Sequence, residues 1–171
     1  MKLILSLFLL FSINASSATT SQNLQTKEST EDKIKTISAY EEEYDDIINL
    51  VDPLKKNVLI FSVTWCSPCK TLKNKLEENQ DIDHSSVQIL YVLTDQDDNG
   101  NRSEDGMPNP SMDESLTKMG QGYWPFIMLF EPGSQTPVSK FPLIKGHKNP
   151  CPNTLFYDRI MDFISSGNVC R

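Results

Sequence analysis

Short apolar runs alternate with polar, turn-forming stretches along this chain, and they predict four strands. "NVLIFSVT", residues 57–64, and "SVQILYVLT", residues 86–94, are rich in β-branched residues and apolar almost throughout, which is typical of strands buried on both faces. "PFIMLFE", residues 125–131, and "PVSKFPLI", residues 137–144, are separated by "PGSQT", and they predict a β-hairpin.

Longer stretches place apolar residues every three or four positions, which is the period of an amphipathic helix. They cover 31–51, 69–79 and 112–119, and a last one begins at a capping Asn153 and stops at Gly167. Strands that alternate with helices and end in a hairpin predict an α/β fold, with a central mixed sheet and helices on both faces.

The amino-terminal region predicts export from the cytoplasm. Residues 1–18 contain one lysine, an apolar run at 3–13 and small residues before Ala18, which is the layout of a secretory signal peptide. The run is too short for a membrane-spanning helix, which needs about 20 residues. Residues 19–30 are rich in Ser, Thr and Gln and predict a flexible lead-in. We therefore expect one domain at 31–171, in a periplasmic or secreted protein without membrane insertion after signal cleavage.

Charge narrows the classes of partner. The chain has 171 residues and a formal net charge of −7, and it carries no basic stripe. Such a surface is poorly suited to nucleic acid or to an anionic membrane. The expected partners are proteins or small thiols.

Two of the four cysteines lie in the pentapeptide "WCSPC", directly after the strand predicted at 57–64. Cys66 falls where this strand gives way to a helix, so free backbone N–H groups of the first turn stabilise its thiolate and lower its pKa below about 8.5. Pro68 suits the first turn, since its missing N–H would have no partner there. Cys69 lies one turn on and faces the core, so Cys66 is expected to be the exposed thiol. The pair predicts a reversible two-electron switch.

A zinc site is the structural alternative for this pair. It would need a second pair of ligands, and His84, His147, Cys151 and Cys170 are all singly placed. We therefore expect no metal and no other cofactor at the dithiol.

"FSVTWCSPCK" resembles the active-site segment of secreted bacterial thiol–disulfide oxidoreductases of the thioredoxin-like superfamily. "YWPFIMLF" resembles the later segment of that family, in which a proline opens a strand. The resemblance implies a thioredoxin-like fold over roughly 31–166, with Cys66 as nucleophile, Cys69 as resolving thiol and Pro125 as a cis-proline beside them. This chain has Trp124 before that proline, where the family has a smaller residue. It also has Ile60 where thioredoxins have a buried acid.

By the same resemblance, Trp65 lies at the rim of the site. The residues expected to contact substrate are Trp65, Ser67, Pro68, Trp124 and Pro125. The implied activity is disulfide exchange with disulfide-containing client proteins or small molecules, supported by an external electron donor or acceptor. The Ser-Pro pair lacks the histidine of strongly oxidising relatives, which favours reduction. The alternatives are a disulfide-forming oxidase, or a redox-silent module that binds a peptide or a metal such as copper.

Cys151 and Cys170 flank the last predicted helix. Outside the cytoplasm, they are expected to form a structural disulfide, and a loop of this length contributes roughly 3 kcal/mol. The functional alternative is a second exchange site that relays electrons from the first.

An acidic loop insertion is expected at about 95–110. Its "DQDDNG" matches the first half of a calcium-binding loop, through Asp95, Asp97 and Asn99. The twelfth position is Gly106 instead of a bidentate glutamate, which favours a solvated surface loop.

Overall fold

The computed structural model describes residues 33–142 and 155–167. Its centre is a five-stranded sheet in the order β1-β3-β2-β4-β5. The strands β1, β3 and β2 are parallel, whereas β4 runs antiparallel to β2, and β5 runs antiparallel to β4. The strands are β1 (Lys35–Ser38), β2 (Lys56–Ser62), β3 (Val87–Leu93), β4 (Phe126–Phe130) and β5 (Ser139–Phe141), and the helices are α1 (Tyr44–Ile48), α2 (Ser67–Glu78), α3 (Pro110–Lys118) and α4 (Phe156–Ser166).

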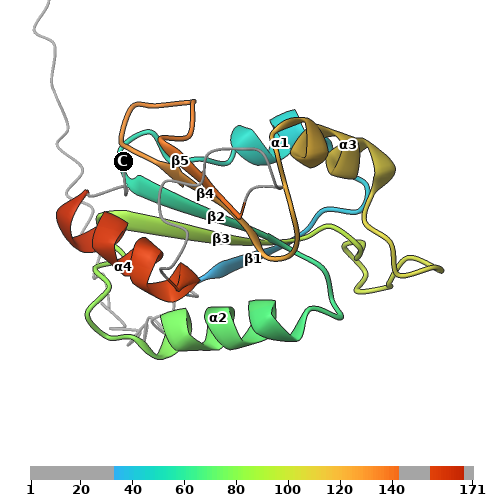
Figure 1. The fold of residues 1–171 in the computed structure, drawn as a ribbon, viewed down its shortest axis with the longest axis horizontal. Helices are drawn as coiled ribbons and strands as arrows, with labels where there is room; N and C mark the ends of the chain where they lie inside the picture. Colours follow the sequence, from blue (N-terminus) through green and yellow to red (C-terminus); the bar gives the residue numbers. More distant parts are fainter. Residues whose placement is uncertain (1–32, 143–154, 168–171) are drawn as a thin grey trace, which may run out of the picture.

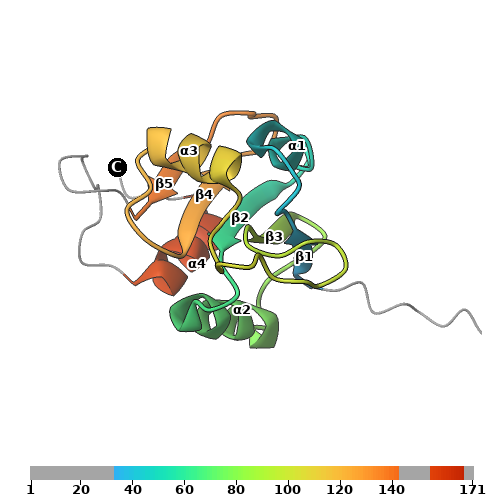
Figure 2. The ribbon, with the colours of Figure 1, turned by 90° about the vertical axis from the view of Figure 1, so that its right-hand side faces the viewer.

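Helices cover both faces of the sheet. Helices α1 and α3 lie on one face, and α2 and α4 lie on the other (Figure 1). The turned view shows the same two layers, with the sheet between them (Figure 2). Each layer has its own apolar cluster: Ile60, Leu76 and Phe163 belong to the α2–α4 side, whereas Phe61, Met112 and Phe126 belong to the α1–α3 side. The predicted α/β class, with a mixed sheet and helices on both faces, is confirmed.

The apolar run that precedes the cysteines forms the centre of the sheet. Strand β2 pairs with β3 on one side and with β4 on the other, and its residues from Asn57 to Ser62 are buried. Because both faces are covered by helices, the strand is apolar almost throughout instead of alternating. This central position gives the segment that follows β2 a rigid base.

The helix predicted at 31–51 is wrong. Residues Lys35–Ser38 form β1, a parallel edge strand on β3, and only Tyr44–Ile48 form a helix. Ile34 and Ala39, which flank this strand, are buried. Pairing with β3 satisfies the backbone of the β-branched Thr36 and Ile37, and it outweighs a modest helix propensity.

The carboxyl-terminal half follows the prediction with three differences. The hairpin forms, but its second strand is only Ser139–Phe141. Helix α4 begins at Phe156, with Leu155 rather than Asn153 at its N-cap position, and Asn153 lies outside the described residues. Leu155, which falls inside the helix predicted to begin at Asn153, precedes α4 and is exposed. The predicted stop at Gly167 is confirmed by its left-handed backbone, with φ of 69°.

The expected signal peptide at 1–18 and the lead-in at 19–30 lie outside the described residues. Within 33–142 and 155–167, no helix is long and apolar enough to cross a bilayer.

Candidate active site

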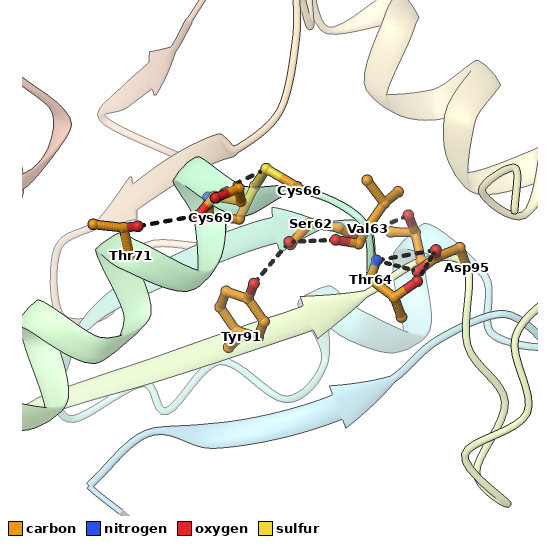
Figure 3. The surroundings of a disulfide bond; sticks show 10 residues. Ser62, Val63, Thr64, Cys66, Cys69, Thr71, Tyr91 and Asp95 are labelled. Carbon is orange, nitrogen blue, oxygen red and sulfur yellow. Dashed lines mark hydrogen bonds between the residues drawn. A yellow bond between two sulfur atoms is a disulfide. The ribbon is translucent and has the colours of Figure 1, made fainter.

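The two cysteines of "WCSPC" meet at the amino terminus of α2. Cys66 is the N-cap residue, and its Sγ accepts a hydrogen bond of 3.2 Å from the backbone N–H of Cys69. The two residues form a disulfide with their Cα atoms 5.3 Å apart (Figure 3). A thiolate at Cys66 would meet the same backbone N–H, and it would lie at the positive end of the helix dipole. The predicted placement of the pair at a strand-to-helix junction is confirmed.

The burial of Cys66 differs from the prediction, whereas that of Cys69 agrees with it. Cys69 is fully buried, as expected, but Cys66 exposes only 4% of its surface, so describing it as the exposed thiol was wrong. Ser67 and Pro68, which lie between the cysteines, are exposed. The packing of Cys66 against the α2–α4 cluster leaves only a small part of it open to solvent.

The segment before β4 lies beside the strand that leads to Cys66. The Trp124–Pro125 peptide is cis, as the resemblance implied. Phe126 pairs with Phe61 in the antiparallel register, so Pro125 precedes β4 at the level where β2 ends. Pro125 is buried, and Trp124 is partly buried and packs against both apolar clusters. Tyr123 is the exposed residue of this segment, at 61%.

Trp65 lies at the surface beside Cys66, and 53% of it is exposed. Its indole N–H donates a hydrogen bond of 2.9 Å to the carbonyl of Gly106, which belongs to the acidic loop. The loop therefore reaches the residue next to Cys66, which periodicity and spacing had not predicted.

Asp95 is a buried carboxylate that the sequence analysis missed as a site residue. It accepts hydrogen bonds from the backbone N–H of Thr64 at 2.8 and 3.0 Å and from the Thr64 hydroxyl at 2.6 Å (Figure 3). Arg102 approaches the same carboxylate, with its Nε 3.6 Å from Oδ2. The available signal was an aspartate directly after a buried strand, but we had assigned it to a solvated surface loop, whereas Asp95 is fully buried. Its structural effect is to hold the turn between β2 and Cys66.

A pair of hydroxyl groups lies near the disulfide on the α2 face of the sheet. The Ser62 hydroxyl and the Tyr91 hydroxyl are 2.8 Å apart, and both residues are buried (Figure 3). Burial raises the pKa of Tyr91 above its usual value of 10.0, so this hydroxyl stays protonated at neutral pH. Ile60 is also fully buried, and its side chain brings no charge to this region.

The acidic loop is folded on itself in the structure. Asp97 accepts hydrogen bonds from the backbone N–H groups of Asn99 and Asn101 and from the Asn101 side chain, at 3.0, 2.7 and 3.0 Å. Among the described residues, no three His, Cys, Asp or Glu side chains are grouped so that they could hold a metal ion. His147, Cys151 and Cys170 lie outside those residues, so the second cysteine pair stays a prediction.

We expect Asp97 to serve the loop and not calcium. Hydrogen bonds, first of all from the Asn101 side chain, lower the pKa of Asp97 below its usual 3.8. The loop should therefore keep its hydrogen bonds above pH 3.8 and lose them as the pH falls through the lowered pKa. Carboxyl chemical shifts followed by NMR during an acid titration measure this pKa. Tight calcium binding in a calorimetric titration, lost in Asp97→Ala, would contradict the expectation.

No family model and no curated protein matches this chain. Solved structures that resemble it include thioredoxin from Trichomonas vaginalis, with 16% identity, a TM-score of 0.45, and coverage of 67% of this chain and 88% of that one. The short form of thioredoxin f from spinach chloroplast has 18% identity and a TM-score of 0.43, over 76% and 90% of the two chains. Thioredoxin from Malassezia sympodialis has 17% identity and a TM-score of 0.39, over 63% and 76%. These thioredoxins are what the chain is similar to, and its own fold is the five-stranded mixed sheet with helices on both faces described above (Figure 1).

Proposed function

We propose that this protein is an extracytoplasmic thiol–disulfide oxidoreductase that mainly reduces disulfides. The observation that carries the proposal is the Cys66–Cys69 disulfide at the amino terminus of α2, closed between residues one helical turn apart. A pair held at this distance opens to two thiols and closes again without rearranging the fold. The expected location rests on the signal-peptide pattern of residues 1–18.

The mechanism follows from the different positions of the two sulfurs. The Cys66 thiolate attacks one sulfur of a client disulfide, which breaks the client S–S bond and forms a mixed disulfide. The displaced client sulfur leaves as a thiolate and takes up a proton. Cys69, as a thiolate, then attacks Cys66 Sγ, closes the internal disulfide and releases the second client thiol. Two electrons pass to the client, and an external dithiol donor must return them.

An exchange assay tests the activity and its direction. The reduced protein should reduce a disulfide-bonded polypeptide, and Cys66→Ser should lower the rate by about three orders of magnitude or more, because the attacking sulfur is lost. Equilibration with glutathione buffers gives the reduction potential. A value near about −270 mV supports a reductase, whereas a value near about −120 mV would show a disulfide-forming oxidase instead. Rates for wild type and Cys66→Ser that are both no higher than the uncatalysed reaction would favour a redox-silent binding module.

A further inference from the structure

The acidic loop is joined to the active-site turn at two points, and this loop is defined here as residues 95–109. At its start, the Asp95 carboxylate accepts three hydrogen bonds from Thr64, two residues before Cys66. Farther along, the Gly106 carbonyl accepts a hydrogen bond from the Trp65 indole. Consecutive residues of the active-site turn are therefore both held by the same loop.

The loop itself is built to present that carbonyl. The backbone N–H of Ser103 donates to the carbonyl of Asp95 at 2.9 Å, and the N–H of Gly106 donates to the carbonyl of Ser103 at 2.9 Å. Gly106 has φ of +66°, a conformation that favours glycine, and a Cβ there would lie 2.5 Å from the Arg102 guanidinium. Because Arg102 also approaches Asp95, the two attachment points belong to one packed unit.

Exposed apolar side chains lie in the segments that adjoin the active-site turn, whereas Cys66 itself is hardly accessible. Cys66 is 4% exposed, whereas Trp65 and Met107 are 53% and 56% exposed. Met107 directly follows the residue that binds the indole. Tyr123, at 61%, belongs to the segment that leads into β4 beside the end of β2. A substrate that touched Cys66 alone would gain little binding energy, whereas a polypeptide could bury these side chains.

Charge also distinguishes small anionic disulfides from polypeptide substrates. The loop carries five acidic residues and one arginine. An anionic small disulfide, such as glutathione disulfide, would meet repulsion of like charge at this rim. A neutral or basic polypeptide segment with an apolar side chain next to its cystine would not.

We propose that the acidic loop is a specificity element, which holds Trp65 as a fixed wall for an extended polypeptide and so favours protein disulfides over small anionic ones. This inference rests on the proposed oxidoreductase activity. Asp95 is a positioning residue in this scheme, since it acts through Thr64, and Trp65 contacts the client.

Two variants detach the loop from the turn without removing either cysteine. Trp65→Phe keeps an aromatic ring but loses the N–H that binds Gly106, and Asp95→Asn removes the charge that binds Thr64. Both should lower kcat/KM for a disulfide-bonded peptide with a neighbouring aromatic residue by about three- to tenfold, mostly through KM. The ratio of kcat/KM for this peptide to kcat/KM for glutathione disulfide should fall with it, because the small disulfide gains little from the fixed indole. Leu54→Ala is the matched control, since it removes an 85% exposed apolar side chain from the segment between α1 and β2.

Comparing the peptide with glutathione disulfide distinguishes a failure of the specificity role from a failure of the proposed oxidoreductase activity. Thermal unfolding of each variant shows whether it is folded at the assay temperature, and Trp65→Phe serves alone if Asp95→Asn is not. Equal loss for both substrates, or a wild-type preference for glutathione disulfide, would overturn the specificity role and leave the oxidoreductase standing. Absence of exchange by wild type with both substrates would overturn the two together.

Discussion

Cys69→Ser is expected to remain covalently joined to its clients. Cys66 still attacks a client disulfide, but no second thiol remains to resolve the adduct. Cells of the native host that express the variant are quenched with acid, and the captured protein is compared on non-reducing and reducing gels. Adducts that disappear on reduction should dominate the non-reducing lanes.

Cys66→Ser is the matched control for this experiment. It replaces the other sulfur of the Cys66–Cys69 pair by oxygen. It should accumulate almost no adduct, because the attacking thiol is missing. Adducts confined to Cys69→Ser identify the clients by mass spectrometry. Similar amounts in both variants, or none in either, would contradict the assigned roles of the two sulfurs and favour a binding module.

Phe126→Ala is expected to lower the free energy of unfolding more than any other substitution proposed here. Phe126 is fully buried, opens β4 directly after the cis-proline, and pairs with Phe61 of β2. Truncation leaves a cavity in the α1–α3 cluster, and such changes lower the free energy of unfolding by about 3–5 kcal/mol. Urea unfolding followed by circular dichroism measures the difference.

Tyr123→Ala provides the comparison in the same segment. Tyr123 is 61% exposed, so its removal should change the free energy of unfolding by less than about 0.5 kcal/mol. A similar decrease in the free energy of unfolding of the two variants would mean that the buried packing of Phe126 does not stabilise the fold as expected.

The sequence predicted the dithiol and its setting because the signals are local. A buried strand followed by "WCSPC" and an amphipathic helix needs only neighbouring residues to be recognised. Cys69, which was predicted to face the core, is buried together with Leu72 and Leu76. The same holds for the hairpin and for the stop at Gly167. The helix predicted at 31–51 was wrong because its outcome depends on β3, some fifty residues away in the chain. Local periodicity contains no information about that pairing.

Amino-acid order alone determined which sulfur lies at the helix terminus, the α/β class and the acidic character of the loop, since these follow from residue type and short-range spacing. The burial of Cys66 and the contacts of the acidic loop were decided by the tertiary structure. Only the packed chain shows that Cys66 is almost covered, that Asp95 binds Thr64, and that Gly106 binds Trp65 across 41 positions of sequence. These are contacts between segments that fold together because β2 and β3 are neighbours in the sheet. Their existence depends on distances in space, which the order of residues does not reveal by itself.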